Sequence, residues 1–226
     1  MPRPRTHDPD AALDAAEAIA ARSGPAAVTI RAVAQATGLS NGALYHTFGS
    51  RAELLGRTWL RAARRFLDVQ TGLVDAHPAP APDDPPKSDR AEPFPREDHD
   101  LAVAAIVAAA DAPGVFTERF PYSSRLLLTV SRDQLIGEKL PATLAEELAD
   151  ADRALVRLMV RLARRLWGRG DRRAVEVMTT CLVDLPTAIL LRRDRITDPL
   201  AREHLRAAVR AVLAVGPNPN PHPQPN

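Results

Sequence analysis

The sequence has few of the residues that build disulfide-linked, membrane-spanning or sheet-rich proteins. It holds one cysteine, Cys181, among 226 residues, so no intrachain disulfide can form, which fits a reducing cytosol. Aromatic residues are only 4% of the chain, whereas alanine and leucine are abundant, and this balance favours helices over sheet. No uninterrupted apolar run reaches the roughly 18 residues of a membrane span, and the N-terminus lacks the apolar core of a signal peptide. We expect an all-α, cytoplasmic protein with no membrane partner.

Catalytic motifs are missing as well. The chain has no Gly-rich phosphate loop, no His-Glu-x-x-His pattern and no paired cysteines, and Cys181 and the six histidines fall in no nucleophile–base motif. We therefore expect no enzymatic activity, no cofactor and no metal. The net charge is only +2, so any affinity for a polyanion has to come from where the charges lie.

Acidic side chains are entirely absent between Thr29 and Arg51, and such a surface tolerates phosphate groups. The same stretch predicts two short helices around a tight turn. Thr29 caps the first helix, Gly38 ends it in the left-handed conformation, and Ser40 caps the second. Two short helices joined by a turn that contains glycine form a helix-turn-helix, which places its second helix in the major groove of DNA.

This stretch resembles the DNA-binding domain of the TetR family of transcriptional regulators, and the resemblance runs without a gap from Leu13 to Leu55. It implies an N-terminal three-helix domain with a helix-turn-helix, joined by a connecting helix to a C-terminal helical domain for ligand binding and dimerisation. It also implies that DNA is contacted by a set of residues at matching positions: Thr29, Ser40, Asn41, Gly42, Ala43, Tyr45, His46, Thr47 and Arg51.

Asn41 is the expected base-reading residue of this set, because an asparagine amide pairs bidentately with adenine. Gly42 and Ala43 allow close approach and apolar contact with a thymine methyl group, and the rest are expected at phosphates. Three alternatives stay open: a helix-start role for Asn41, an ordinary surface position for His46, and a core position for Tyr45. Family members often carry lysine in place of Asn41, and this departure makes the base preference hard to transfer.

Proline-rich breaks and the resemblance together divide the chain. The expected parts are an N-terminal arm at 1–8, a DNA-binding domain at 9–55, a helical regulatory and dimerisation domain at 56–215 with a Pro-rich loop at 76–97, and a disordered tail at 216–226. The arm is either a frayed tail or a basic arm whose Arg3 and Arg5 reach a DNA groove. The loop is either flexible filler or a partner-binding segment.

Helical periodicity predicts the elements of the second part. A capping box at Ser50 and Glu53 starts a long helix that runs to about Val74. Further helices are expected over 98–111, 141–167, 171–193 with a kink at Pro186, and 199–214. An irregular stretch between 112 and 122 holds three aromatic residues, Phe116, Phe120 and Tyr122.

The resemblance implies a homodimer through the helices near 171–193 and 199–214, and a pocket for a partly apolar small molecule. Apolar stripes that only fill the monomer core are the alternative to the dimer. Candidate pocket residues are five walls and one polar anchor: Phe116, Phe120, Tyr122, Met159, Met178 and Asp184. The expected function is a ligand-responsive, sequence-specific DNA-binding regulator, a repressor released from a palindromic operator. The alternative is a helical small-molecule-binding protein of the same fold without DNA binding.

Overall fold

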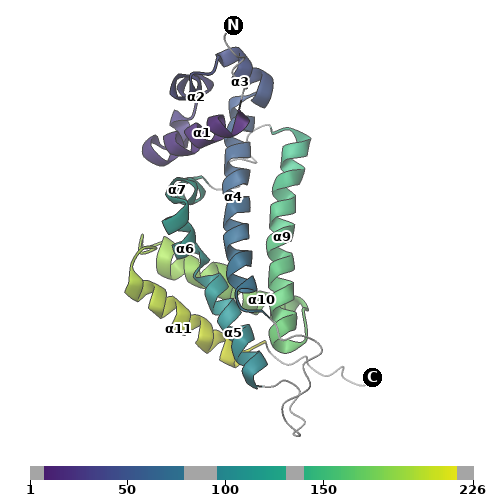
Figure 1. Ribbon diagram of the computed structural model, residues 1–226. Helices are drawn as coiled ribbons and strands as arrows, with labels where there is room; N and C mark the ends of the chain where they lie inside the picture. The colour runs from purple at the N-terminus through teal and green to yellow at the C-terminus, as the bar shows by residue number, and fades with distance from the viewer. Residues whose placement is uncertain (1–7, 79–95, 131–139, 218–226) are drawn as a thin grey trace. The chain divides into compact units, whose positions relative to one another are not determined.

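The computed structural model describes residues 8–78, 96–130 and 140–217, and every regular element within these ranges is a helix (Figure 1). Most of the expected arm, the greater part of the Pro-rich loop and the C-terminal tail lie outside the described residues. The chain forms two compact units. The first joins residues up to Leu67 with those of Phe116–Arg153, and the second joins Asp68–Val115 with the residues from Ala154 onward.

The first unit begins with α1 (Pro9–Ser23), the short 3-10 helix η1 (Pro25–Ala27), α2 (Ile30–Thr37) and α3 (Asn41–Phe48). Figure 1 shows these helices close together near the N-terminus. Each of the three α-helices is capped, at Thr29 and Ser40 as the sequence predicts and at Asp8 as well. A side-chain oxygen of the capping residue accepts a backbone N–H two or three residues on, at 3.0–3.1 Å: Asp8 from Asp10, Thr29 from Ala32 and Ser40 from Ala43.

The turn between α2 and α3 is also as predicted. Gly38 ends α2 at φ 72°, a left-handed conformation that costs glycine nothing and most other residues about 1–2 kcal/mol. The core of this unit then forms from side chains of α1, α2, α3, the long helix α4 (Arg51–Asp75) and α7 (Pro121–Thr129). Its most deeply buried members include Ala12, Ala16, Val28, Val33, Leu44, Phe48, Leu54 and Leu126.

The long helix α4 (Arg51–Asp75) starts with only half of the predicted capping box. Ser50 Oγ accepts the N–H of Glu53 at 3.0 Å, as expected. The reciprocal bond is replaced, because the Ser50 N–H donates to Phe48 O and the Glu53 carboxylate accepts from Arg57 Nε at 2.8 Å. A charge-assisted bond to arginine is stronger than one to a neutral N–H, so Arg57 draws the carboxylate away from the cap.

The prediction of an irregular stretch between 112 and 122 is wrong. The structure has two helices there, α6 (Ala112–Arg119) and α7 (Pro121–Thr129), separated by Phe120. Pro113 lies in the first turn of α6, where the missing N–H of proline does no harm, and Pro121 opens α7 in the same way. The prolines therefore start helices here instead of breaking them.

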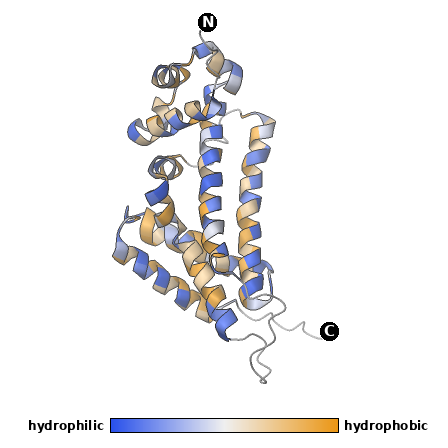
Figure 2. Ribbon diagram, viewed as in Figure 1, coloured by the Kyte–Doolittle hydropathy of each residue, from blue (hydrophilic) through white to orange (hydrophobic). Residues whose placement is uncertain are grey.

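The second unit contains α5 (Arg96–Ala110), α10 (Arg172–Thr179), the π-helical segments η2 (Thr180–Asp184) and η3 (Thr187–Leu191), and α11 (Pro199–Val215). The long helix α9 (Ala142–Trp167) belongs to it by its C-terminal part. Figure 2 shows orange and blue turns alternating along α11, as an amphipathic helix requires. The core of the second unit is formed by fully buried side chains: Ala102, Ala105, Ile106, Ala109, Leu162, Met178, Cys181, Leu190, Leu205 and Val209.

The helix predicted over 171–193 continues through Pro186 as one helical run, Arg172–Leu191. π turns lie on both sides of the proline, with the N–H of Leu185 bonded to Thr180 O and that of Arg192 to Thr187 O. Proline lacks an N–H and its ring collides with the carbonyl four residues earlier in an α-helix. The wider π turns on both sides make room for the proline ring without ending the helix.

The same run corrects the expectation that no segment is apolar enough for a membrane span. Arg172–Leu191 passes by length and composition, with a mean hydropathy of 1.6, and one third of that window (33%) is buried within the chain. The bent pair α5 and α6 would pass only if taken together. Core helices of soluble proteins meet the same criterion, so this run alone does not indicate a membrane protein.

Candidate nucleic-acid interface

Helix α3 presents a mixed polar and aromatic face to solvent. Leu44 and Phe48 are 1% and 2% exposed and hold the helix against the core, whereas Asn41, Gly42 and Tyr45 are exposed. Tyr45 is 56% exposed, so it is not the core aromatic of the alternative interpretation. His46 and Thr47 are exposed as well, while Ala43 is half-buried. The members of the predicted set that α3 exposes are therefore Asn41, Gly42, Tyr45, His46 and Thr47.

The two capping residues of the set, Thr29 and Ser40, are exposed with their hydroxyl oxygens already accepting a backbone N–H. A hydroxyl has one proton to donate besides its acceptor lone pairs. Each cap is therefore still able to donate to a phosphate oxygen, and the N-termini of α2 and α3 favour negative charge. Because Ser40 makes the capping bond of α3, the amide of Asn41 has no capping task.

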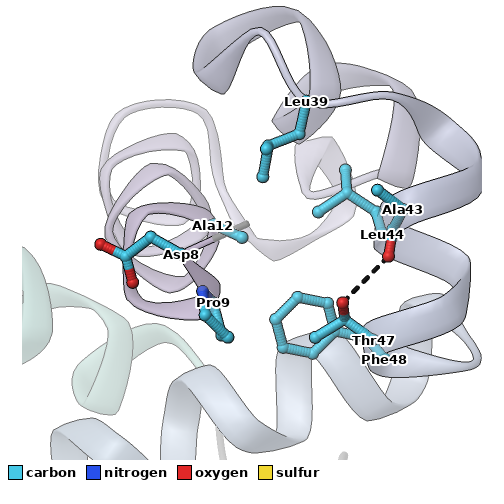
Figure 3. A pocket seen from close by; sticks show the side chains of 8 residues that line it. All are labelled: Asp8, Pro9, Ala12, Leu39, Ala43, Leu44, Thr47 and Phe48. Atoms are coloured by element: carbon cyan, nitrogen blue, oxygen red, sulfur yellow. Dashed lines mark hydrogen bonds between the residues drawn. The ribbon is translucent and has the colours of Figure 1, made fainter. Parts of the chain in front are cut away.

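The Thr47 hydroxyl, which we expected at a phosphate, makes a hydrogen bond inside α3. It donates to Ala43 O at 2.9 Å (Figure 3). A small hollow separates this part of α3 from the start of α1, with Asp8, Pro9, Ala12, Leu39, Ala43, Leu44, Thr47 and Phe48 around it. Its volume of about 10 Å³ admits no more than one water molecule, so it is no ligand site.

Arg51 is turned toward the protein. Its Nε donates to Val28 O at 2.7 Å and its Nη2 to Pro25 O at 2.8 Å, and the side chain is half-buried. These bonds tie the first turn of α4 to the segment between α1 and α2. The contact with phosphate that the resemblance implies for Arg51 stays a prediction.

Two exposed residues of α2, Arg31 and Gln35, were missed by the sequence reasoning. They lie within the same acid-free stretch, and Arg31 brings a cation to it. Helical spacing would have found them: with Ile30 and Val33 inward, positions 31 and 35 point outward.

A buried carboxylate fixes α1 to two other helices of this unit. Glu17 is 4% exposed and lies 3.0 Å from Arg61 Nη2 and 3.1 Å from Arg65 Nη1, both on α4. Ser123 of α7 donates its hydroxyl to Glu17 Oε2 at 2.9 Å. We call Glu17, Arg61, Arg65 and Ser123 the Glu17 cluster. It anchors the first helix of the DNA-binding part.

The predicted ligand-binding residues do not gather in one unit. Phe116, Phe120 and Tyr122 belong to the first, where Phe116 meets Phe120 at a ring distance of 5.6 Å and Tyr122 is 48% exposed. Met159 and Met178 are buried in the core of the second unit, 4% and 0% exposed, and Asp184 is exposed. Their role at a shared pocket stays a prediction.

Gln70 is a polar group in the second unit that the sequence reasoning missed. It is 1% exposed, and its Nε2 donates to Ala109 O at 3.1 Å. That bond fixes the amide orientation, because a carbonyl can only accept. Gln70 Oε1 has no hydrogen-bond partner among the described residues, which is unusual for a buried acceptor.

Cys181 is not a nucleophile at neutral pH. Burial raises the pKa of the Cys181 thiol to about 12, so the thiol stays protonated. Within the described residues, no group of three or more His, Cys, Asp or Glu side chains is placed to hold a metal ion.

Residues 12–58 match the family of bacterial regulatory proteins of the tetR type. The N-terminal domain is that of the TetR family. The match includes α2, α3 and the start of α4, which are the elements that carry the exposed face described above.

Solved structures of transcriptional regulators, some of them of the TetR family, share the fold over at least nine tenths of the chain. The regulator PfmR of Thermus thermophilus is 20% identical with a TM-score of 0.57, over 90% of this chain and 97% of PfmR. A TetR-like regulator of Rhodococcus sp. RHA1 is 17% identical with a TM-score of 0.58, over 94% and 99%. A proposed regulator of Saccharomonospora viridis, solved with choline, is 17% identical with a TM-score of 0.56, over 91% and 95%. Comparison with curated protein sequences found no match.

Proposed function

We propose that this protein is a ligand-responsive, sequence-specific DNA-binding transcriptional regulator of the cytoplasm, and a repressor that a small molecule releases from a palindromic operator. The observation that carries the proposal is the exposed, acid-free face of α3 in a TetR-type domain. Asn41 and its neighbours would meet base edges, and Thr29, Ser40, Tyr45 and His46 would meet phosphates.

A homodimer through α10–η3 and α11 is part of the proposal, because one reader helix gives little affinity and two read a palindrome. The outward face of α11 supports it. Exposed side chains three or four positions apart on that face are apolar or small, apart from one histidine: Leu200, His204, Ala207, Ala211 and Val215. Leu200 is 55% exposed, and Val183 of η2 is 37% exposed. Apolar stripes left open on a helix mark surfaces that another chain covers.

Regulation by a small molecule is supported by two features. The Saccharomonospora viridis protein of the same fold was solved with choline. Here, the unsatisfied, buried Gln70 Oε1 would gain a hydrogen bond from a ligand that carries a donor. Ligand binding would favour a dimer whose two reader helices are wrongly spaced for DNA.

Duplex binding across salt concentrations tests the proposal against the alternative of a small-molecule-binding protein without DNA binding. Regulators that contact several phosphates lose affinity steeply with salt, so log K should fall linearly with log salt concentration. Tyr45→Phe removes a phosphate donor and should weaken all duplexes alike, whereas Val156→Ala, on the exposed surface of α9, is the matched control without effect. No binding at about 50 mM salt would exclude the proposal, since non-specific DNA binding is strongest there.

A further inference from the structure

The exposed face of α3 has an unusual composition for a DNA reader. From Ser40 to Ser50 the sequence contains neither arginine nor lysine. The nearest cation along the chain on the C-terminal side is Arg51, whose guanidinium donates to Val28 O and Pro25 O at 2.7 and 2.8 Å. A bidentate arginine or lysine on guanine is the commonest base-specific contact in the major groove. The first turn of α3 has no group for it.

The groups that this turn does offer match the other base pair. The Asn41 amide is exposed, and the N-cap bond of α3 is made by Ser40, so both its donor and its acceptor are available. That pair of groups fits N7 and N6 of adenine. Asn41 is the first residue of α3, but the capping bond does not occupy its amide.

Gly42 adds an open space beside the amide. A Cβ at this position would meet nothing within 4 Å except Ser40 Oγ at 3.9 Å, so the backbone of α3 is bare toward solvent. The thymine C5-methyl group protrudes into the major groove, and cytosine has none. A bare backbone next to Asn41 accommodates that methyl group.

We infer that the base pairs facing the first turn of α3 are A·T pairs, read by the Asn41 amide on adenine and by the bare Gly42 backbone at a thymine methyl group. Arg31 lies on α2, outside this turn, and we assign it to a phosphate instead of a base. The inference rests on the proposed function, because it names the DNA that the proposed site selects.

Selection from a random duplex library with the full-length protein tests it, with the Asn41→Ala variant selected in parallel. The position read by Asn41 is the one in each half-site whose preference relaxes in Asn41→Ala. We expect adenine at that position. Replacing it with another base should weaken binding about 5- to 150-fold. Asn41→Arg should change the preferred base at that position to guanine. Arg31→Ala is the control, and it should lower overall affinity while that position keeps its adenine.

The outcomes separate the two proposals. A palindrome with guanine or cytosine at the Asn41-dependent position, or a palindrome whose every position survives Asn41→Ala, overturns the A·T inference and leaves DNA binding standing. Failure to enrich any sequence, together with no duplex binding at low salt, overturns the proposed function and this inference with it. Circular dichroism of Asn41→Ala checks that the exposed substitution leaves the helices formed.

Discussion

Each of the two compact units holds one buried carboxylate between two arginines, and the two arrangements differ in what they connect. In the first unit, Glu17 of α1 binds Arg61 and Arg65 of α4 and accepts the Ser123 hydroxyl of α7. In the second unit, Asp111, at the junction of α5 and α6, is bound by Arg202 at 2.8 Å and Arg206 at 2.7 Å, both on α11. We call Asp111, Arg202 and Arg206 the Asp111 cluster.

The two clusters also differ in the balance of charges and in solvent exposure. Arg61 has further acidic partners in Asp10 and Asp14, at 3.4 and 2.7 Å, so acids are not outnumbered around Glu17. Around Asp111 two arginines share one carboxylate, and the side chain of Arg206 is 39% exposed. The Glu17 cluster thus anchors the helix that supports the DNA reader, and the Asp111 cluster anchors the helix proposed for dimerisation. Substitutions in the Glu17 cluster should therefore weaken DNA binding first, and substitutions in the Asp111 cluster should weaken the dimer first.

The largest effect is expected from Glu17→Ala. Breaking a buried ion pair leaves uncompensated charge and costs roughly 3–5 kcal/mol, and the partial exposure of Arg65 puts the expected loss at about 3 kcal/mol. Urea unfolding would measure it, and DNA affinity should fall while the dimer persists. Asp14→Ala is the matched control, because Asp14 contacts the same arginine from an exposed position, with its side chain 65% exposed. Equal losses for the two variants would contradict the account.

Asp111→Ala should cost less, about 2 kcal/mol, because Arg206 can turn to solvent once the carboxylate is gone. Its functional signature should be a weaker dimer, measured by sedimentation at decreasing protein concentration. Arg202→Ala should reproduce most of this loss and Arg206→Ala less, since Arg202 donates to both carboxylate oxygens. A dimer as tight as wild type in Asp111→Ala would remove the proposed link between this cluster and α11.

Gly114→Ala tests the Asp111 cluster by placing a methyl group against Arg202. A Cβ there would lie 2.6 Å from Arg202 Nε, so the guanidinium has to move. Such overpacking costs about 1 kcal/mol or more. Because the bonds between Arg202 and Asp111 are already absent in Asp111→Ala, the double variant should be less destabilised than the sum of the singles. Strict additivity of the unfolding free energies would show that Arg202 does not couple the two positions.

The smallest effect is expected at an ion pair on the surface, Asp171 with Arg169. The hydrogen bond from Arg169, more than those from the first turn of α10, lowers the pKa of Asp171 to about 2. A depressed pKa stabilises the folded state above the ordinary aspartate pKa of about 4 and loses that effect as pH falls toward 2. Thermal melts of wild type and Asp171→Asn should therefore differ slightly at pH 5 and converge toward pH 2. A difference that grows toward pH 2 would have the wrong sign.

Local signals in the sequence predicted most of what lies within one helix or turn. The caps at Thr29 and Ser40 and the left-handed Gly38 depend on residues at most three positions apart, so the pattern was sufficient. Prolines were harder, because the same residue opens a helix at Pro121 and is accommodated by π turns at Pro186. Which outcome occurs depends on the hydrogen bonds around the proline.

Contacts between distant segments could not be predicted. Ser123 meets Glu17 across 106 positions, and Arg202 meets Asp111 across 91. Periodicity marks which face of a helix is buried and does not identify its neighbour. The same limit applies to Arg51, whose carbonyl partners lie in a turn that the motif does not include. The exposed face of α3 was predictable because it follows from the helix alone.

Hydrogen–deuterium exchange of the full-length protein, with and without duplex DNA, tests the central claim most directly. The account predicts that DNA slows exchange in peptides covering Thr29–Ser50, with the strongest effect in the first turn of α3, and leaves α11 unchanged. Protection confined to the second unit, or none at a DNA concentration that saturates binding, would contradict a reader built on α3.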